Sequence, residues 1–296
     1  MRPGSPEWGI CAEHDPKTFA LAKLSPGFQE IRTLPSTRNK ETYILPHTLT
    51  GERRRLALMS ELLDPLHRTL LEKIGLRPGW RCLEVGCGNG SVSRWMAGKV
   101  GAKGRVIATD VDLRYIDHLR APNLEVRQLD ILKDKIEPGK YDLVTARAIL
   151  HHIRSPKKAI QNMVRALKPG GVLLSIEPDF LPASAATPEA LRLFWQAWLE
   201  WSQSVGIDYF IGRTMPGLLT AANLDKVAAE GTTALYPGDT PWAKYWIETI
   251  DELRPRLLES GYMTRPMLTR FHRSYTDARL WTSAITFVAS WGSKPR

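Results

Sequence analysis

The spacing of hydrophobic positions changes along the chain, and each change marks a different kind of predicted element. Residues 1 to about 40 carry several Pro and Gly and no sustained period, which predicts an extended or partly ordered arm. Leucines recur at helical spacing from Thr50 to Ile74, and Gly75 stands where a C-terminal helix cap is expected. From Arg81 to Ile176, strand patterns alternate with helical ones. This alternation predicts a parallel sheet with right-handed crossover connections.

The pattern becomes less regular after residue 176. Helical spacing is present at Pro188–Gln203, Thr214–Ala222 and Pro241–Ser260, and strand patterns are present at Lys226–Tyr236 and Trp281–Trp291. The segments at about 180–212 and 237–279 are longer than simple connections between strands require. Tryptophans concentrate between Trp195 and Trp246, which is typical of core packing or of a closed apolar chamber. We expect these segments to form, with the N-terminal helix, a lid over the carboxyl edge of the sheet.

One turn between a strand and a helix carries the strongest chemical signal. An apolar strand ends in Glu84-Val85-Gly86-Cys87-Gly88-Asn89-Gly90, and helical spacing resumes at Ser91. Glycine has no Cβ and tolerates positive φ, so such a turn lets the backbone approach a ligand closely. In open α/β sheets, ligands bind at this carboxyl edge. The dinucleotide fingerprint has its third glycine one residue later, and Glu84 suits a ligand with an ammonium group better than a pyrophosphate.

Further strand motifs follow the glycine turn in a fixed order. They are Val106–Asp110, Leu124–Asp130, Tyr141–Arg147 and Lys168–Ile176. Asp110 stands about 20 residues after the glycines, where an acid can accept hydrogen bonds from both ribose hydroxyls of a nucleoside.

In this order the motifs resemble those of the class I S-adenosylmethionine (SAM)-dependent methyltransferases. The resemblance implies an α/β fold with a Rossmann-like, seven-stranded, mostly parallel sheet, an antiparallel last strand and helical lid or cap insertions. It also implies SAM as the cofactor. The expected organisation is an N-terminal arm and lid helix (1–76), a SAM-binding core (77–178), a helical cap insertion (179–212), a core helix and strand six (213–236), a second cap insertion (237–279) and a final core strand (280–296).

The resemblance also assigns cofactor contacts to particular residues. In the glycine turn they are Glu84, Gly86, Cys87, Gly88, Asn89 and Gly90. After the next three strands they are Asp110 and Val111, then Asp130 and Ile131, then Arg147. The resemblance places Asp110 at the ribose and Asp130 at the adenine amino group.

A second resemblance involves the segment before the core. Thr42–His47, followed by Arg55-Leu56 and Asp64-Pro65, is similar to an N-terminal segment of bacterial small-molecule methyltransferases. In those proteins the segment closes over the methionine end of the cofactor. This implies that Tyr43 is a lid residue in contact with the cofactor, with simple packing as the alternative.

His151 and His152 follow the fourth predicted strand, at the edge where the cofactor is expected. A general base is needed only if the methyl acceptor must lose a proton, as a hydroxyl or an activated carbon does. An unperturbed imidazole, with a pKa of about 6.5, is largely neutral at neutral pH and accepts a proton. The two histidines are therefore the candidate catalytic residues, with loop packing as the alternative. Glu177 and Asp179 are further polar candidates near the same edge, with solvated loop carboxylates as the alternative.

Composition agrees with that of an ordinary soluble enzyme. The 296 residues are 43% hydrophobic and 24% charged, which is enough to bury a sizeable core. No apolar run approaches the roughly 18–20 residues that a membrane span requires, and no secretory signal is visible. The three cysteines give neither a metal-binding spacing nor a disulfide framework. We expect a cytoplasmic protein without a bound metal or a membrane partner.

Net charge raises the question of a nucleic-acid partner. The 41 basic and 31 acidic residues give a formal charge of +10. The densest basic run, Arg53-Arg54-Arg55, opens a leucine-rich helix, where a solvated helix face explains it better than a phosphate-binding stripe. Without an aromatic-rich RNA-binding motif, we do not expect nucleic acid as a partner.

Three functions agree with the sequence. The leading hypothesis is a methyltransferase that acts on a small, largely apolar molecule in specialised, natural-product metabolism. The alternatives are a methyltransferase of RNA or protein, and a non-catalytic SAM-binding protein. The acceptor atom and the oligomeric state stay open, with a homo-oligomer among the alternatives.

Overall fold

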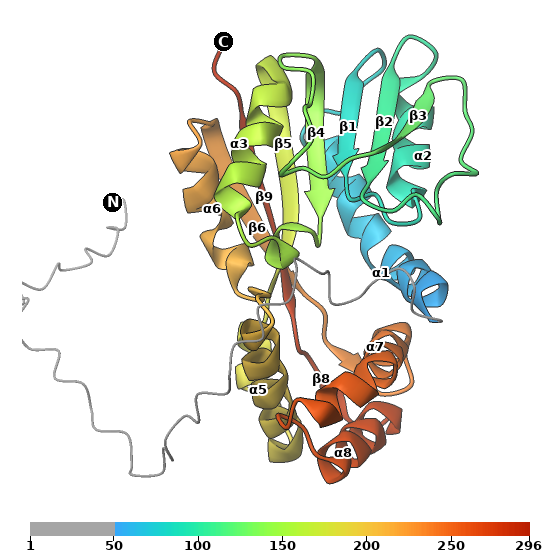
Figure 1. Ribbon diagram of the computed structural model, residues 1–296, viewed down its shortest axis with the longest axis vertical. Coiled ribbons are helices and arrows are strands. Elements are labelled where there is room, and N and C mark those ends of the chain that lie inside the picture. Colours follow the sequence, from blue (N-terminus) through green and yellow to red (C-terminus); the bar gives the residue numbers. More distant parts are fainter. Residues whose placement is uncertain (1–50) are drawn as a thin grey trace, which may run out of the picture. The chain divides into compact units, whose positions relative to one another are not determined.

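The computed structural model describes residues 51–296, and a seven-stranded sheet forms the centre of this part (Figure 1). The strands are β1 (Arg81–Val85), β2 (Arg105–Asp110), β3 (Leu124–Gln128), β4 (Tyr141–Arg147), β5 (Leu167–Asp179), β6 (Asp225–Thr233) and β9 (Thr286–Ser293). They lie in the order β3-β2-β1-β4-β5-β9-β6. β9 runs antiparallel to β5 and β6, and the other neighbours pair in parallel. The predicted Rossmann-like, mostly parallel sheet is confirmed.

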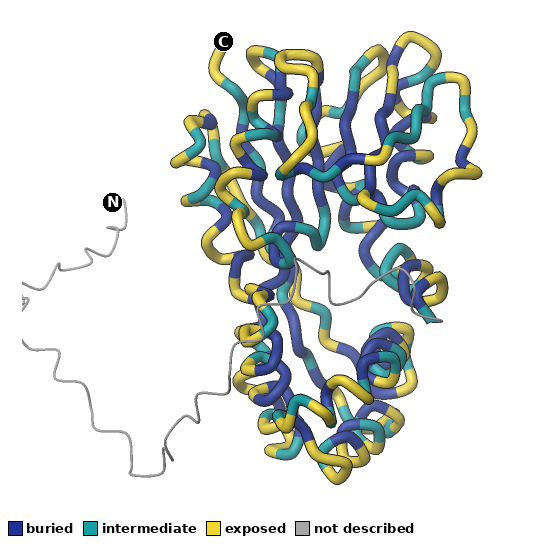
Figure 2. The backbone as a smooth tube through the Cα atoms, in the orientation of Figure 1, coloured by how far each residue is buried: buried dark blue, intermediate teal, exposed yellow. Residues whose placement is uncertain are grey.

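Helices cover both faces of this sheet, and others lie beyond the carboxyl ends of its parallel strands. They are α1 (Glu52–Lys73), α2 (Ser91–Val100), the 3-10 helix η1 (Leu150–His152), α3 (Pro156–Ala166), α4 (Leu181–Ser184), α5 (Glu189–Ser204), α6 (Ile211–Ala221), α7 (Pro241–Glu259) and α8 (Arg265–Thr276). Cys82 and Leu143 pack with α1 and α2, whereas Leu83 and Val144 pack with α3 and α6. Successive residues of β1 and β4 thus enter opposite layers, as expected for strands that are buried on both faces. Figure 2 shows the resulting buried positions along the sheet.

The helix predicted from Thr50 to Ile74 is confirmed as α1. Gly75 follows it with a φ of +89°, and its N–H donates to the carbonyl of Glu72 at 3.0 Å. Leu63, Leu70 and Leu71 of this helix are buried in the core on the α1–α2 side of the sheet, and Leu62 and Leu66 are partly buried against it. α1 is therefore anchored beside β1 and β4, where it can reach their carboxyl ends.

The two last predicted strands are shorter than expected, which corrects the sequence analysis. β6 ends at Thr233, and the residues beyond it form a separate strand, β7 (Tyr236–Pro237). β7 pairs with β8 (Trp281–Thr282) in a two-stranded ribbon, so Trp281 lies outside the main sheet. In the ribbon, Tyr236 is buried and Trp281 is 57% exposed. Both segments are extended as predicted, but they belong to a different pair of strands.

The cap contains α5, α7 and α8, which lie beyond the carboxyl ends of the parallel strands in Figure 1. α4 and α5 fall within residues 179–212, and α7 and α8 fall within 237–279. The sequence pattern did not predict α8 as a separate helix. Its N-cap is Thr264, whose hydroxyl accepts a hydrogen bond from the N–H of Met267 at 3.4 Å.

Aromatic rings hold the cap helices together. Phe194 of α5 stacks on Phe271 of α8 with ring centroids 4.2 Å apart. Trp195 of α5 meets Trp246 of α7 edge to face at 4.9 Å.

Within residues 51–296, no helix has both the length and the apolarity needed to cross a membrane.

Candidate cofactor-binding and active site

The glycine turn after β1 has the backbone conformation that its sequence predicts. Gly86 and Gly88 have φ values of +69° and +59°, in the left-handed region that other residues rarely adopt. A Cβ on Gly86 would lie 2.1 Å from Cδ1 of Ile149, whereas a Cβ on Gly88 would meet only Leu56, at 3.4 Å. The turn therefore excludes side chains at Gly86 for lack of space, and at Gly88 mainly by backbone conformation.

Asp110 ends β2 directly beside this turn. Its Oδ2 accepts a hydrogen bond from the N–H of Gly88 at 3.0 Å, and its Oδ1 accepts one from the N–H of Asp112 at 3.3 Å. The Asp110 side chain is nearly buried, whereas the next residue, Val111, is 51% exposed. The end of β2 thus offers a fixed carboxylate and an accessible apolar side chain next to each other.

Asp130 and Ile131 lie after β3. The Asp130 carboxylate accepts the N–H of Leu132 at 2.9 Å and pairs with the ammonium of Lys133 at 2.9 Å. Partial burial alone would raise the pKa of Asp130, but these two donors lower it, so the carboxylate is ionised at neutral pH. Ile131 is buried beneath it.

Glu84 lies near the end of β1, and Cys87 lies inside the turn that follows. The carboxylate of Glu84 is buried and accepts a hydrogen bond from the hydroxyl of Ser93 in α2. Burial raises the pKa of Glu84 to about 7, although Ser93 and the charge of Arg147 oppose this effect. Burial also raises the pKa of the Cys87 thiol, which makes it a poor nucleophile.

A polar network links α1 to the turn and to the end of β4. Oδ1 of Asp64 accepts hydrogen bonds from Nη1 of Arg147 at 2.9 Å and from the hydroxyl of Ser91 at 3.1 Å. The hydroxyl of Ser60 donates to Oδ1 of Asn89 at 3.0 Å. The sequence analysis named Arg147 and Asn89 but gave no role to Ser60 or Asp64. Their signal was two polar residues, four positions apart, within a leucine-rich helix.

His151 and Glu177 form a buried pair at the loop after β4. Nδ1 of His151 lies 3.0 Å from Oε2 of Glu177. The same carboxylate accepts the backbone N–H groups of Ile149, Leu150 and His151, at 3.1, 2.9 and 3.3 Å. Sequence reasoning noted Glu177 as a polar group near this edge, but the pairing requires the register between β4 and β5.

Burial perturbs both members of this pair. It lowers the pKa of His151 to about 3, with a further contribution from the positive charge of Arg55, and it raises the pKa of Glu177 to about 7. When ionised, Glu177 can only accept hydrogen bonds, so Nδ1 of His151 is the protonated nitrogen. This tautomer leaves Nε2 as the proton acceptor of a neutral imidazole.

The His152 ring lies against the His151 ring, with centroids 3.8 Å apart and planes tilted by 39°. Burial lowers the pKa of His152 as well, and the charges of His151 and Arg55 lower it further. On its other side, the His151 ring lies 5.3 Å from the ring of Tyr209. Tyr209 in turn lies 4.4 Å from Phe180 and 5.9 Å from Trp198, so the histidine pair touches the aromatic cluster of the cap.

Residues 52–229, more than half of the chain, match the family model described as a methyltransferase domain. The chain belongs to this methyltransferase family. The predicted resemblance to class I SAM-dependent methyltransferases is confirmed, and SAM is the cofactor of the family.

Two relatives and one solved structure illustrate the likeness. The ubiquinone/menaquinone biosynthesis C-methyltransferase UbiE of Ectopseudomonas mendocina is 33% identical over 133 residues, which cover 40% of this chain and 52% of UbiE. The highly reducing polyketide synthase ltbA of Aspergillus luteorubrus is 32% identical over 170 residues, which cover 45% of this chain and 5% of the synthase. Phosphoethanolamine N-methyltransferase 2 of Haemonchus contortus, solved with S-adenosyl-L-methionine, has a TM-score of 0.56 at 15% identity, over 89% of this chain and 62% of its own. This chain thus spans about half the length of UbiE, and the likeness to the solved structure shows the fold.

The residues of this methyltransferase fit its cofactor. The glycine turn keeps a surface free of Cβ atoms at Gly88, and Asp110 beside it places a carboxylate where hydroxyl groups can donate. The exposed Val111 supplies an apolar surface for a planar ring. Tyr43, the predicted lid residue, lies outside the described residues, and its role stays a prediction. Among residues 51–296, no cluster of His, Cys, Asp or Glu has the arrangement of a metal site.

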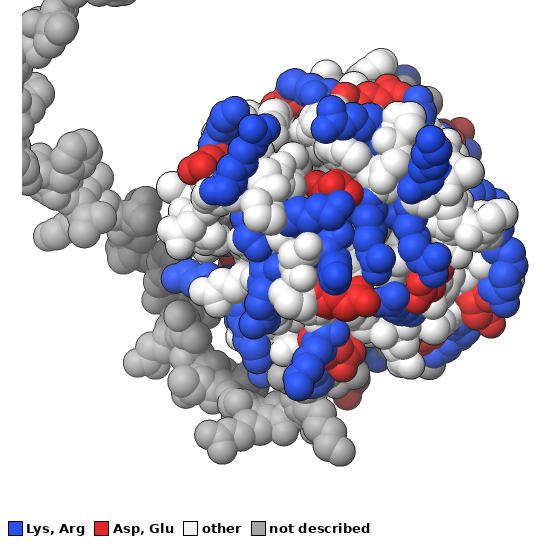
Figure 3. All heavy atoms as spheres, turned by 90° about the horizontal axis from the view of Figure 1, so that it is seen from above, with Lys and Arg blue, Asp and Glu red and all other residues white. Residues whose placement is uncertain are grey.

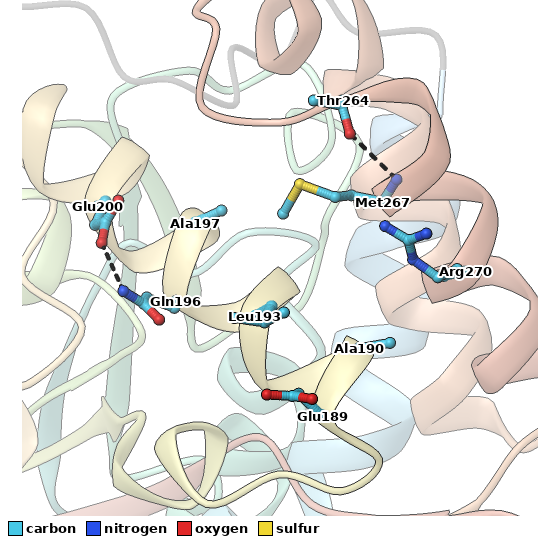
Figure 4. Close-up of a pocket in the computed structure, with 9 residues that line it drawn as sticks. All are labelled: Glu189, Ala190, Leu193, Gln196, Ala197, Glu200, Thr264, Met267 and Arg270. Carbon is cyan, nitrogen blue, oxygen red and sulfur yellow. Dashed lines mark hydrogen bonds between the residues drawn. The ribbon is translucent and has the colours of Figure 1, made fainter. Parts of the chain in front are cut away.

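The cap also holds a cavity of about 570 Å³ on its outer side, between α5 and α8 (Figure 4). Leu193 and Ala197 of α5 and Met267 of α8 supply its apolar part, and Glu189 and Arg270 its charged part. None of the predicted cofactor or catalytic residues lines this cavity. It is therefore distinct from the site at the sheet edge.

Proposed function

We propose that this methyltransferase transfers a methyl group from SAM to a small, largely apolar molecule that must lose a proton. The observation that carries the proposal is the contact between the His151–Glu177 pair and the aromatic cluster of the cap, through Tyr209. A proton acceptor and an apolar aromatic surface are thereby adjacent at the carboxyl edge of the sheet. Names of the relatives support this acceptor class, since UbiE is a C-methyltransferase of quinone biosynthesis and ltbA is a polyketide synthase.

When bound, SAM supplies a methyl group that its sulfonium already activates. The protein then has to align the acceptor, exclude water and, for this acceptor class, remove a proton. Glu177 fixes Nδ1 of His151, and Nε2 accepts the acceptor's proton. Burial holds the pKa of His151 far below its ordinary value, so the imidazole is neutral but weakly basic, and an ionised Glu177 at Nδ1 strengthens it as a base. We assign His151 as the general base, and His152 as the ring that packs against it.

One further donor supports an acceptor that carries an oxygen atom. Nε1 of Trp198 is buried and has no hydrogen-bond partner among residues 51–296. A buried N–H without a partner is costly, so a ligand oxygen that accepts from it would bind favourably. Trp198 lies next to Tyr209, which contacts the proposed base. Phenols, quinols and 1,3-dicarbonyl compounds combine an acidic proton, an oxygen and an apolar body.

The basic surface of the protein argues against RNA as the acceptor. Figure 3 shows Lys and Arg side chains gathered on the face seen from above, at the amino edge of the sheet. Several of these residues pair with acids, as Arg105 does with Glu125 and Lys168 with Asp142. The glycine turn and His151 lie at the opposite, carboxyl edge. We therefore infer that the +10 charge does not serve acceptor binding.

A methyl-transfer screen tests the proposal. The full chain is incubated with methyl-labelled SAM and separate panels of phenols and quinols, 1,3-dicarbonyl thioesters, RNA and peptides. Label in one of the first two classes, lost in His151→Ala but kept in His118→Ala, is the expected result, since His118 is an exposed histidine. Label in RNA or peptide instead, or full activity of His151→Ala, contradicts the proposal.

A further inference from the structure

Asp64 of α1 is a nearly buried carboxylate that ties together three elements of the core. Its Oδ1 accepts hydrogen bonds from Nη1 of Arg147 at the end of β4 and from the hydroxyl of Ser91 at the start of α2. Its Oδ2 accepts a hydrogen bond from Nη2 of Arg68, one turn further along α1, at 2.9 Å. The side chains of Asp64 and Arg147 are only 7% and 10% exposed. A charge pair this well buried adds little net stability, because desolvation offsets the attraction between the charges.

The same helix also holds the glycine turn through its side chains. The hydroxyl of Ser91, which donates its proton to Asp64, lies 3.1 Å from that of Ser60, and Ser60 donates to Oδ1 of Asn89. Asn89 in turn accepts the N–H of Ser91 at 3.2 Å and donates to the carbonyl of Leu56 at 3.4 Å. α1 therefore determines where the last residues of the turn lie relative to the end of β4.

The charges around this network suit a zwitterion. The carboxylate of Glu84 is affected electrostatically by the guanidinium of Arg147 and by the carboxylates of Asp64 and Asp110, and Arg147 is hydrogen-bonded to Asp64. The amino-acid end of SAM carries an ammonium and a carboxylate, whereas the nucleoside end carries neither. A ligand with both charges can pair its ammonium with the acids and its carboxylate with Arg147.

We propose that Asp64 is a positioning residue for the amino-acid end of the cofactor, which it serves by orienting Arg147. The inference goes beyond the proposed function, because it concerns how the amino-acid end of the cofactor is recognised and does not depend on the methyl acceptor. It predicts that a change at Asp64 affects ligands with an amino-acid end and spares those without one.

Calorimetry with two probes tests this prediction on the full chain. S-adenosylhomocysteine has the amino-acid end, and 5′-methylthioadenosine lacks it while keeping the nucleoside and the sulfur. In Asp64→Asn, which keeps the size of the side chain, we expect S-adenosylhomocysteine to bind about 10-fold to 100-fold more weakly. The affinity for 5′-methylthioadenosine should change by less than about 2-fold. Glu61→Gln, the same change at an exposed position on α1, is the matched control and should leave both affinities unchanged.

A second variant keeps the proposal testable if Asp64→Asn does not fold. Arg147→Gln removes the partner, and it should show the same selective loss. If both variants fold, the double variant should be no worse than Arg147→Gln alone, because Asp64 acts through Arg147. Equal weakening of both probes would show that Asp64 is only structural, and unchanged binding of S-adenosylhomocysteine in either variant would overturn the proposal. Failure of the methyl-transfer screen would leave this result unaffected.

Discussion

The glycine-turn region and the aromatic cap are built by different kinds of contact. Around the turn, charged and polar side chains meet at hydrogen-bond distance, as Asp64 does with Arg147 and Asp110 with Gly88. In the cap, rings such as Trp195 and Trp246 contact one another with few polar partners. Hydrogen bonds fix direction as well as distance, whereas apolar contacts constrain mainly volume. The turn is therefore suited to one invariant ligand, and the cap to a surface whose shape can differ between related proteins.

The His151–Glu177 pair lies where the two regions meet, and the largest predicted effect concerns it. Glu177→Gln keeps the shape of the side chain but no longer enforces the tautomer of His151. The rate of methyl transfer at saturating cofactor should fall by about 10²–10⁴-fold, with little change in SAM affinity. Single-turnover measurements from pH 5 to 9 check this. The wild-type rate should rise with pH through about 7, as Glu177 ionises, and the variant should lack this step. A retained step near pH 7 in the variant would assign it to another group.

The cap should respond to the loss of volume. Trp195 is fully buried among the rings of α5, α7 and α8. Trp195→Ala should lower the free energy of unfolding by about 3–5 kcal/mol, through lost burial and the cavity left behind. Trp281→Ala, at the exposed position on the ribbon, is the control and should cost less than about 1 kcal/mol. Urea unfolding followed by circular dichroism measures both, and equal losses would show that the cap is not a packed unit.

The turn should respond to the loss of one carboxylate. Asp110→Ala should weaken the binding of S-adenosylhomocysteine by about 1–3 kcal/mol, because charge-assisted hydrogen bonds to the ribose are lost. Asp112→Ala is the neighbouring control and should have a smaller effect. Unchanged affinity of Asp110→Ala in calorimetry would refute the assignment of this residue to the ribose.

The smallest expected effect is on folding stability, and it concerns a buried histidine of α1 that lies against β4. His67 of α1 lies 2.9 Å from the hydroxyl of Thr145, and burial, with the charge of Arg147, lowers its pKa well below 6.5. Below pH 6.5 the unfolded chain binds a proton at this residue that the folded chain does not, so folding stability falls as the pH falls. The contribution is at most about 1.4 kcal/mol per pH unit. His67→Gln should lose stability less steeply than wild type below pH 6.5, and parallel slopes in urea titrations would contradict the shift.

The sequence predicted what depends on local motifs. The glycine turn, the place of Asp110 at the end of a strand and the alternation of strands and helices from Arg81 to Ile176 follow from short runs whose conformation their own residues dictate. By contrast, Asp64 and Arg147 are 83 positions apart, and His151 and Glu177 are 26 apart. Such pairs exist only after the strands have found their register. The ribbon of β7 and β8 was misassigned for a related reason, because alternation predicts a strand but does not say which strand it pairs with.

The carboxylate of Glu177 has a consequence for how this active site can change during evolution. One side chain closes the loop Ile149–His151 by accepting three backbone N–H groups and also sets the proton on the imidazole. Asp, whose side chain is one methylene shorter, cannot keep both the contacts with the backbone N–H groups and the contact with Nδ1 of His151. A substitution that shortens this side chain, such as Glu177→Asp, therefore affects the loop and the imidazole together. The structure of the loop and the protonation of the His151 imidazole thus depend on the same carboxylate.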